Sequence, residues 1–600
     1  MKTLGTACLV ALSTLCAQEL RLEKLGTHLT GVFNRGSAEI SAYDAASRRL
    51  FVVNGDRRQI DVLDLDSPSQ PRPVQAIRID PAWGNAPNSI AVKNGVVAVA
   101  VEAARRTDAG SVIFFDAQGR YQNHVPTGAV PDMVTFSPDG RWVLTANEGE
   151  PSANYATDPE GSVTVIDLAK GVANPSVRQV RFTEWNTATV SPGMRIFGPG
   201  ASFAQDVEPE YIAVSPDSTR AWVTLQENNA IAEIDVAGAR IVRVLPLGYK
   251  DHSKAGNGLD VSDRDNKIDI RNWPIFGMYM PDGIAAISQG GRTYLLTANE
   301  GDAREYDGFA EEARVGALKL DATAFPDAPN LARNENLGRL TVTKASGDTD
   351  GDGDYDRLYT LGGRSFSVWD TEGNLVWDSG DQFEQLTAKE FPRLFNSDAS
   401  GGLDTRSDNK GPEPETIVTA TFGNRTYAFI ALERMGGVMV YDITDVRSPR
   451  FVHYTWGRLA EGRPEAGTAG DHGPEGLLVI PAAESPTGEP LLVTANEVSG
   501  STTIYRIVLP QASVSARIRS DKAVTTETEY LLDASGSTGG GLTYSWRSVD
   551  GKASLLDAGS ARARAYFGSG IGDYTFEVTV TDKAGAAATQ RTTITYLGIR

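Results

Sequence analysis

One repeated pattern limits what most of this chain can fold into. It consists of a proline and an acidic residue, a short apolar strand, a turn, a second apolar strand ending in glutamate, and a third strand that usually ends in aspartate. The clearest copies begin at Pro131, Pro209, Pro281, Pro414 and Pro474. A small sheet cannot bury its faces without neighbours, so strand units of roughly 40 to 50 residues with almost no helical periodicity between them predict an all-β fold, a β-propeller.

The number of blades stays open at seven or eight. Residues 281–378 hold either two blades or one blade with a large insertion. Residues 20–29 have the composition of a strand, and we expect them to complete the last blade. That pairing would close the ring and remove exposed sheet edges, which otherwise promote aggregation.

The pattern changes after Pro510. Residues 532–537, 544–546 and 572–582 alternate as the strands of a sandwich do, and Trp546 suits its core. This stretch resembles an immunoglobulin-like module of the PKD type. We therefore predict a signal peptide at residues 1–17, a propeller at 18–509 and a PKD-type, Ig-like β-sandwich at 510–600.

The N-terminus has the order of a secretory signal: Lys2, an apolar run at residues 7–15, then small residues. We expect cleavage after Ala17, and a lipoprotein attached through Cys16 stays open as the alternative. Cys8 and Cys16 are the two cysteines of the chain, so the mature protein would form no disulfide. The predicted location is secreted, extracellular or periplasmic.

The charge balance excludes one class of partner. The chain has 57 Lys and Arg against 77 Asp and Glu, a formal net charge of −20. Binding to phosphate backbones needs a basic surface, so we expect no nucleic-acid partner. No later stretch has the length of apolar sequence that a membrane span needs. Calcium is abundant outside cells and prefers carboxylate and carbonyl oxygens, so we expect Ca²⁺ to stabilise the long loops instead of disulfides.

The strongest calcium motif lies at residues 348–356. It matches the first half of a calcium-binding loop, with Gly353 at the sharp turn and Tyr359 where an EF-hand has its bidentate glutamate. The predicted ligands are Asp348, Asp350, Asp352, Asp354 and Asp356. A solvated acidic turn is the alternative. A second, weaker candidate consists of Asp260, Asp263, Asp265 and Asp269, for which an ordinary polar loop is the alternative.

The repeat itself places acids at two positions in each blade. The first strand lies nearest the propeller axis, so its start and the end of the second strand open on the same face. The acids after the prolines are Asp132, Glu210, Asp282, Glu415 and Glu475, and those at the second-strand ends are Glu148, Glu227, Glu300, Glu433 and Glu497. Like charges about 4 Å apart repel by several kcal/mol, so a ring of these acids requires metal ions, basic partners or raised pKa values.

We interpret part of this ring as a metal site with basic neighbours. The predicted ligands are Glu148, Glu300, Glu433 and Glu497, and the basic groups in loops on the same face are Arg304, Arg406, Lys410, Arg434 and His472. Metals beside arginine suit a phosphate or carboxylate ligand. For an enzyme, Arg304, Arg434 and His472 are the predicted catalytic residues. The structural alternative is that each glutamate caps backbone amides in a turn that recurs with the blade.

Five longer motifs carry a resemblance to a known family. They lie at residues 260–285, 297–314, 347–369, 411–445 and 473–505. Together they resemble the bacterial choice-of-anchor I proteins, which are related to the mesenchyme-specific cell surface glycoprotein family. The resemblance implies an exported propeller of the YVTN or WD40-like kind. Some relatives are described as alkaline phosphatases, an analogy at the level of fold.

Two functions remain open from the sequence. The first is a calcium-dependent phosphomonoesterase, alkaline phosphatase-like, that acts on a small phosphorylated substrate. The second is a non-catalytic, calcium-stabilised protein that binds an extracellular glycan or protein. Clustering of the predicted glutamates and Arg304 would favour the enzyme, and their dispersal would favour the binding protein.

Overall fold

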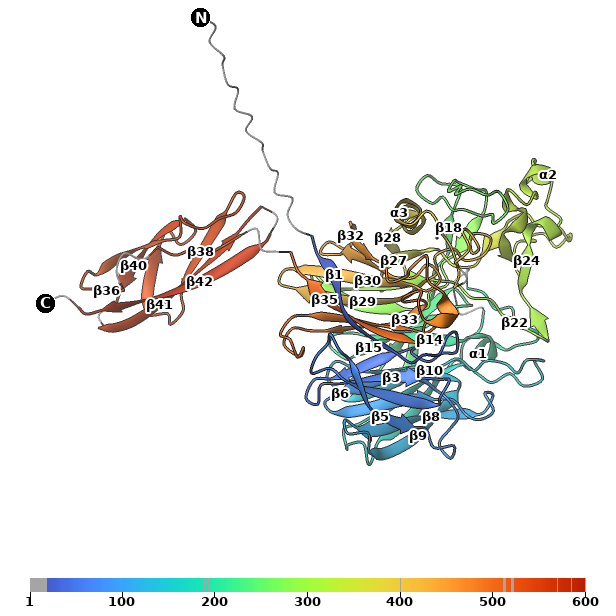
Figure 1. The fold of residues 1–600 in the computed structure, drawn as a ribbon, viewed down its shortest axis with the longest axis horizontal. Coiled ribbons are helices and arrows are strands. Elements are labelled where there is room, and N and C mark those ends of the chain that lie inside the picture. Colours follow the sequence, from blue (N-terminus) through green and yellow to red (C-terminus); the bar gives the residue numbers. More distant parts are fainter. Residues whose placement is uncertain are drawn as a thin grey trace, which may run out of the picture. The chain divides into compact units, whose positions relative to one another are not determined.

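The computed structural model describes residues 19–187, 190, 194–399, 401–510, 514–519, 523–568, 570–583 and 585–598. The predicted signal peptide lies outside these residues. The chain divides into two compact units. The larger unit comprises Leu22–Ala420 and Thr426–Ile507, and the smaller one contains Val508–Arg600 (Figure 1).

The larger unit contains seven four-stranded antiparallel sheets within the described residues, each a propeller blade. Blade 1 consists of β2 (Ser41–Asp44), β3 (Arg49–Asn54), β4 (Gln59–Asp64) and β5 (Arg72–Arg78). Blade 2 consists of β6 (Pro87–Lys93), β7 (Val96–Val101), β8 (Ala109–Asp116) and β9 (Tyr121–Ala129). Blade 3 consists of β10 (Pro131–Phe136), β11 (Trp142–Asn147), β12 (Ser162–Asp167) and β13 (Ser176–Arg181). Blade 4 consists of β14 (Pro209–Val214), β15 (Arg220–Leu225), β16 (Ala230–Asp235) and β17 (Arg240–Pro246). Blade 5 consists of β20 (Ile284–Gln289), β21 (Arg292–Asn299), β27 (Ser365–Asp370) and β28 (Leu375–Asp378). Blade 6 is β29 (Pro414–Phe422), β30 (Arg425–Leu432), β31 (Val438–Asp442) and β32 (Arg450–Thr455), and blade 7 is β33 (Pro474–Ile480), β34 (Leu491–Asn496), β35 (Ser501–Val508) and β1 (Arg21–Leu29).

The hydrophobic core lies between the blades. One cluster joins Phe51 and Val62 of blade 1 to Val97 and Phe115 of blade 2, and all four are buried. Other clusters join later blades in the same way. Each sheet therefore depends on its neighbours for burial, which is the expected physics of a propeller.

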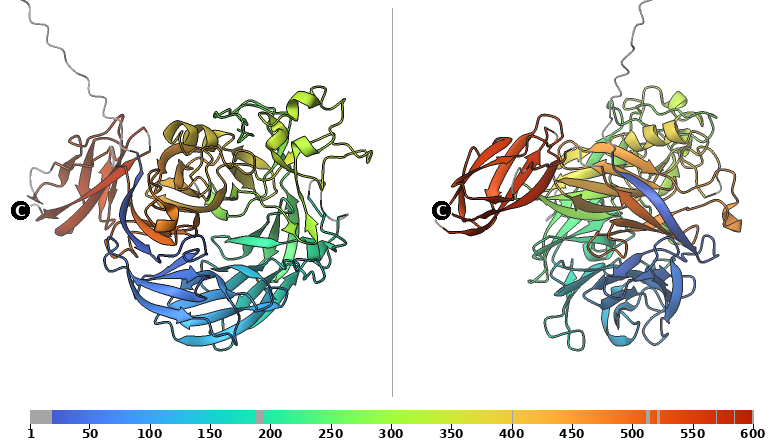
Figure 2. Two further views of the ribbon diagram at one scale, coloured as in Figure 1. Left: turned by 45° about the vertical axis from the view of Figure 1, so that its right-hand side comes forward. Right: turned by 60° about the vertical axis from the view of Figure 1, so that its left-hand side comes forward.

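Strand β1 confirms the prediction for the N-terminal segment. It pairs with β35, the third strand of blade 7, although more than 470 residues separate Thr27 from Thr503, whose hydroxyl groups lie 2.9 Å apart. In Figure 2 the dark blue strand runs beside the orange strands of the last blade. The first and last parts of the propeller sequence thus share one sheet, which closes the ring.

Residues 281–378 form one blade with a large insertion, which settles the blade number at seven in the described chain. Two segments, one between β17 and β20 and one between β21 and β27, hold β18 (Tyr249–Asp251), β19 (Phe276–Met278), β22 (Glu305–Tyr306), β23 (Phe309–Ala310), β24 (Glu312–Arg314), η1 (Val315–Ala317), α2 (Ala328–Leu331), η2 (Leu337–Arg339), β25 (Thr341–Thr343) and β26 (Tyr359–Thr360). They share a core that contains Trp273, Phe325 and Leu358. Outside this insertion lie α1 (Phe203–Asp206), α3 (Gln382–Glu390) and η3 (Pro464–Ala466).

The smaller unit is a β-sandwich. One sheet has the order β36 (Val524–Thr525), β42 (Ala587–Tyr596), β41 (Gly572–Thr581) and β38 (Thr543–Ser548), and the other has β37 (Glu529–Asp533), β40 (Arg562–Phe567) and β39 (Ala553–Leu556). Trp546 is buried between them with Phe576 and Leu532, as the sequence predicted. In the described residues of the whole chain, no helix is long and apolar enough to cross a membrane.

The closure by β1 gives a first prediction. Deleting residues 19–29 should expose the edge of β35 and lower the melting temperature, because blade 7 loses a strand and the ring loses its closure. Differential scanning calorimetry and size-exclusion chromatography measure both effects. The double variant Arg21→Gln, Leu29→Ser is the control, since both side chains are exposed and the strand remains. Equal melting temperatures for the deletion and the control would contradict a closing role for β1.

Candidate functional site

All seven blades meet at one end of the central channel. A cavity of about 290 Å³ is lined there by residues at or just before the start of each first strand. These residues are Glu39, Asn88, Asp132, Tyr211, Asp282, Glu415 and Glu475, one for each blade in chain order. The wall also contains Glu497 and Arg106. We call the acids at this end of the channel the carboxylate ring.

Backbone pairing explains why the acids point into the channel. Pro131 lies opposite Asn147, so Asp132 and Glu148 lie next to each other at the blade end. The Glu148 N–H donates to the Val130 carbonyl at 2.9 Å, and Glu497 makes the same bond to Gly473. The register shifts just after the proline in several first strands, and such irregularities re-aim side chains. The glutamate backbone therefore closes the blade, while its side chain stays available to the channel.

The Thr-Ala-Asn-Glu motif combines two roles. The asparagine side chain binds the third strand inside the blade: Asn147 Nδ2 donates to Ser162 and Thr164, and Asn496 Nδ2 donates to Ser501. Asn299 donates to Ser365 and Ser367 in the same way. The asparagine is thus structural, whereas the glutamate that follows it faces the channel.

The ring resolves into groups of three acids. Oxygen atoms of Asp132, Glu148 and Glu210 lie within 4.8 Å of one another, and so do those of Asp282, Glu300 and Glu415. The first group combines both acids of blade 3 with the acid that follows the proline of blade 4. The second group combines both acids of blade 5 with the corresponding acid of blade 6. This spacing is short enough for three carboxylates to share one cation.

Glu300 also belongs to a third group, with Glu413 and Glu433. Here basic side chains are present: Lys410 Nζ lies 2.6 Å from Glu300 Oε1 and 3.4 Å from Glu413 Oε2. Arg434 Nη2 lies 2.9 Å from Glu433 Oε1, and its side chain is 35% exposed. This side of the ring thus has its own cations, while the group around Glu148 has no basic side chain within ion-pair distance among the described residues.

Burial raises the pKa of most ring acids, and neighbouring carboxylates add to the effect. The pKa rises to about 7 for Asp282 and Glu227 and to about 8 for Glu433, with burial the main cause in each case. Glu413 differs: burial raises its pKa, but Lys410, Arg406 and Arg434 together lower it below the usual range. The ring therefore favours either bound protons or a bound cation.

One buried oxygen shows that the ring has unused binding capacity. Glu227 is 5% exposed, and its Oε2 has no hydrogen-bond partner. A buried carboxylate oxygen without a partner is costly unless a proton or a cation satisfies it. The donor set of the ring is carboxylate oxygen, which fits a hard cation such as calcium.

Some ring residues escaped the sequence analysis. Glu39 precedes β2 without a proline, and burial raises its pKa to about 9. Glu413 stands directly before Pro414, so the Pro-acid pattern did not select it. Searching for any acid within two residues of a first-strand start would have found both.

The three predicted catalytic residues lie in different surroundings. Arg304 is 2% exposed and forms ion pairs with Asp206 and, at 3.3 Å, with Glu208. His472 is buried, its Nε2 lies 3.1 Å from the Ala469 carbonyl, and burial lowers its pKa to about 4. Arg434 alone combines partial exposure with contact to the ring. Arg304 and His472 are therefore held by the protein itself.

The loop at residues 348–356 brings together part of its predicted ligand set. Asp348, Asp350 and Asp356 form one group, and Asp354, Asp356 and Asp321 form another. Asp321 was not predicted; its N–H donates to the Tyr355 carbonyl. Asp352 belongs to neither group, and Lys319 Nζ lies 2.8 Å from Asp354. Gly353 has a φ of +89°, the sharp turn that the motif predicts.

The weaker candidate loop shows a different arrangement. Asp260 is buried and accepts hydrogen bonds from the Ser262 and Asp269 N–H groups, while Asp263 lies 2.9 Å from Arg339 and Asp269 lies 2.7 Å from Lys267. Asp265 lies 3.7 Å from the same lysine. The four carboxylates do not converge within the described residues, so they match the polar-loop alternative.

Two solved structures resemble the chain at low similarity. Hydrazine synthase from Kuenenia stuttgartiensis is 12% identical, with a TM-score of 0.42, over 79% of this chain and 97% of its own. The β-propeller domain of Cps50 (Swd1) from Myceliophteria thermophila is 9% identical, with a TM-score of 0.41, over 81% of this chain and 100% of its own. Similarity at this level bears on no function.

Two relatives of known sequence are more similar. Gigasin-3a from Magallana gigas is 31% identical over 212 residues, which are 32% of this chain and 73% of that protein. The mesenchyme-specific cell surface glycoprotein of Strongylocentrotus purpuratus is 26% identical over 278 residues, 40% of this chain and 35% of the glycoprotein. The chain thus spans about a third of the second relative.

Family models cover most of the chain. Residues 519–596 match the K319L-like PKD domain, which confirms the module predicted after the propeller. Residues 39–446 match the choice-of-anchor I domain, which spans the first strands of blades 1 to 6 and the acids of the carboxylate ring except Glu475 and Glu497. The chain therefore belongs to the choice-of-anchor I family and carries a PKD domain at its C-terminal end.

Proposed function

We propose that this protein is an extracellular calcium-binding propeller whose metal-loaded channel mouth binds an anionic group of an extracellular glycan or protein. The observation that carries the proposal is the convergence of buried acids from successive blades in groups of three, beside a Glu227 oxygen without a partner. A cell-surface relative supports the extracellular setting.

The donor chemistry favours calcium over softer metals. The groups consist of aspartate and glutamate, and no histidine belongs to any of them within the described residues. Oxygen-only sites suit calcium or magnesium, and flexible carboxylates at variable spacing suit calcium better, since magnesium demands near-ideal octahedral geometry.

Different residues of the carboxylate ring would have different roles in binding. The groups around Glu148 and Glu300 would hold the ion, which supplies positive charge for an incoming anion. Arg434, partly exposed beside Glu433, would donate hydrogen bonds to that anion as a planar fork. Lys410 would neutralise the acids that the ion leaves unpaired.

The contacts of Arg304 and His472 favour binding over catalysis. Both side chains are buried and contact groups of the protein itself, so neither is free to contact a substrate in this conformation. A phosphatase would need other groups to hold the phosphoryl oxygens.

One observation nevertheless keeps phosphomonoester hydrolysis as a second candidate. Glu300 belongs to two neighbouring acid groups at once. Shared carboxylates are typical of two-metal sites, in which two ions stabilise the attacking and the leaving oxygen of a displacement.

Calcium should stabilise the protein by mass action. A ligand that binds only the folded state at a hundredfold excess over its dissociation constant adds about 2.7 kcal/mol. Titration calorimetry should detect ring and loop sites separately: Glu300→Gln should remove the binding at the ring groups that contain Glu300, and the double variant Asp348→Asn, Asp356→Asn should remove the loop binding. Glu184→Gln, at an exposed site, is the control. A melting temperature that a chelator leaves unchanged would contradict calcium binding at both places.

Hydrolysis is tested on the purified mature protein with 4-nitrophenyl phosphate and a panel of phosphomonoesters, with and without calcium. The binding function predicts no calcium-dependent turnover. If turnover occurs, Glu300→Gln should abolish it while Arg434→Lys mainly raises KM, because lysine keeps the charge but loses the fork. Turnover in wild type that Glu300→Gln eliminates would replace the binding function with the enzymatic one.

The raised pKa values give a pH prediction for the calcium-free protein. The unfolded chain releases the protons of Asp282, Glu227 and Glu433 near pH 4, whereas the folded protein keeps them up to about pH 7 or 8. Between these limits the folded state binds more protons, so its stability should fall as pH rises from 5 to 8. Asp282→Asn should reduce this slope, and Glu184→Gln should not. Saturating calcium should reduce the slope as well, because the cation replaces the protons. Urea unfolding at each pH measures the effect, and stability that rises over this range would contradict it.

A further inference from the structure

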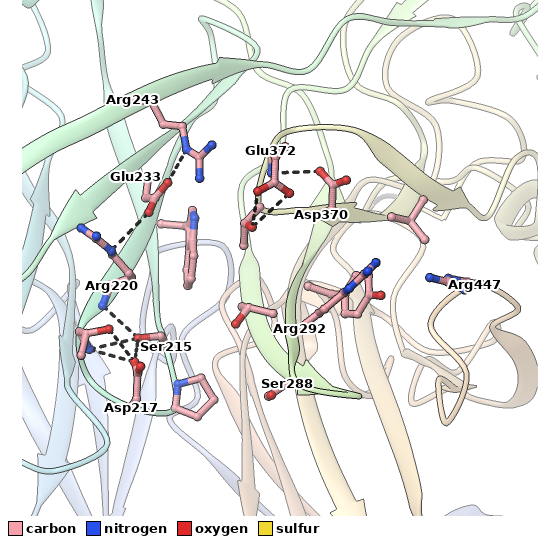
Figure 3. A pocket seen from close by; sticks show the side chains of 18 residues that line it. Ser215, Asp217, Arg220, Glu233, Arg243, Ser288, Arg292, Asp370, Glu372 and Arg447 are labelled. Atoms are coloured by element: carbon pink, nitrogen blue, oxygen red, sulfur yellow. Dashed lines mark hydrogen bonds and ion pairs between the residues drawn. The ribbon is translucent and has the colours of Figure 1, made fainter.

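A second cavity lies at the opposite end of the blades from the carboxylate ring. Its volume is about 850 Å³, and it runs between blades 4 and 5 and reaches the β31–β32 turn of blade 6, which carries Arg447 (Figure 3). Ser215 and Asp217 follow the end of β14, the strand whose start faces the ring, and Ser288 and Arg292 flank the turn between β20 and β21. We call this cavity the interblade groove. It shares no lining residue with the ring cavity.

The acids that line the groove are already engaged. Glu233 lies 3.5 Å from Arg220 Nε and 2.5 Å from Arg243 Nε, so one carboxylate serves two guanidinium groups. Asp370 accepts hydrogen bonds from the backbone of Glu372 and from Asn374, and thereby holds its own turn. In Figure 3 these two sets of residues face each other from the two blades.

Several donors in the groove have no acceptor. Arg292 and Arg447 are exposed, and the described part of the chain offers neither side chain an ion pair. Trp222 is among the lining residues and is 2% exposed, and its buried Nε1–H has no hydrogen-bond partner. Arg220 Nη1 is likewise buried without a hydrogen bond. A buried donor without a partner is rare in folded proteins and points to a ligand that supplies the acceptor.

We propose that the interblade groove binds an acidic oligosaccharide, with its carboxylate or sulfate groups held by Arg292, Arg447 and the Trp222 N–H. Two guanidinium groups and a fixed N–H donor suit such an anion. This site is independent of the calcium ring, since it lies at the other end of the blades.

The lining favours a saccharide over a peptide. Hydroxyl groups occur along the groove at Ser215, Thr219, Ser288, Thr293 and Thr371. The Ser215, Thr219 and Thr371 hydroxyls donate to acids of the lining, which leaves their lone pairs as acceptors. Together with Ser288 and Thr293 they match sugar hydroxyls, which both donate and accept hydrogen bonds. The aromatic rings of the lining, Trp222 and Tyr294, are buried, so they offer no open apolar pocket for a peptide side chain. The volume lies near the upper end of the range for small-molecule sites and exceeds the space that one inorganic anion needs.

The test uses titration calorimetry with four probes: hexagalacturonate, a sulfated heparin-type hexasaccharide, neutral maltohexaose and hexaglutamate. At least one acidic saccharide should bind. Its affinity should be the same in the presence of calcium and in the presence of a chelator, and it should decrease as the salt concentration increases. The two acidic saccharides distinguish carboxylate from sulfate recognition, and either result supports the proposal.

Arg292→Gln and Arg447→Gln should each weaken this binding by about tenfold, since each removes charge-assisted hydrogen bonds. Trp222→Phe keeps the ring packing and should weaken binding by removing the N–H. Arg78→Gln, an exposed arginine on β5 in blade 1, is the matched control and should bind as wild type does. The proposal is overturned if neither acidic saccharide binds, if hexaglutamate binds more tightly than both, or if Arg292→Gln and Arg447→Gln bind as tightly as Arg78→Gln.

Discussion

Burial of apolar side chains between neighbouring blades is the interaction on which the rest of the propeller depends. Each four-stranded sheet has two faces to bury, and only the next blade can cover them. Phe51, Val97 and Phe115 show the pattern: they come from two sheets and form one core. Since every blade needs a neighbour on both sides, the chain must close into a ring, and β1 provides that closure by joining the last blade.

The closed ring has an electrostatic consequence. It brings the starts of seven first strands to one channel mouth, and the repeat carries an acid at most of these positions. The acids then lose solvent and gain like-charged neighbours at the same time. Raised pKa values at Asp282 and Glu433 are the result. Protons, a bound cation and the basic residues near Glu300 are alternative ways to balance the same charge, so the cation affinity proposed for the ring would depend on pH.

The two ends of the blades have different chemistry because strands and turns contribute differently. At the ring end, a proline and a register shift place acids toward the axis. At the other end, blades 4, 5 and 6 carry arginines and hydroxyl groups along a groove. An acidic protein with a net charge of −20 thus keeps unpaired guanidinium groups in one confined place. A single repeated scaffold can in this way present two unlike surfaces.

The sequence alone determined four features: the all-β propeller, the role of residues 20–29, the PKD-type module after Pro510 and the side of the blades on which the acids gather. These features follow from local patterns of apolar and turn residues, which the chain carries in order. The blade number and the division of the ring into groups depended on distances between segments far apart in the sequence. Asp132, Glu148 and Glu210 converge because blades 3 and 4 are neighbours, whereas Asp260 and Asp263 separate although they are close in the chain. Arg304 shows the same limit, since its burial against Asp206 and Glu208 depends on an insertion folding over the blade end. Sequence spacing fixes which residues share a strand, but only tertiary packing fixes which charges lose their solvent and which partners they meet.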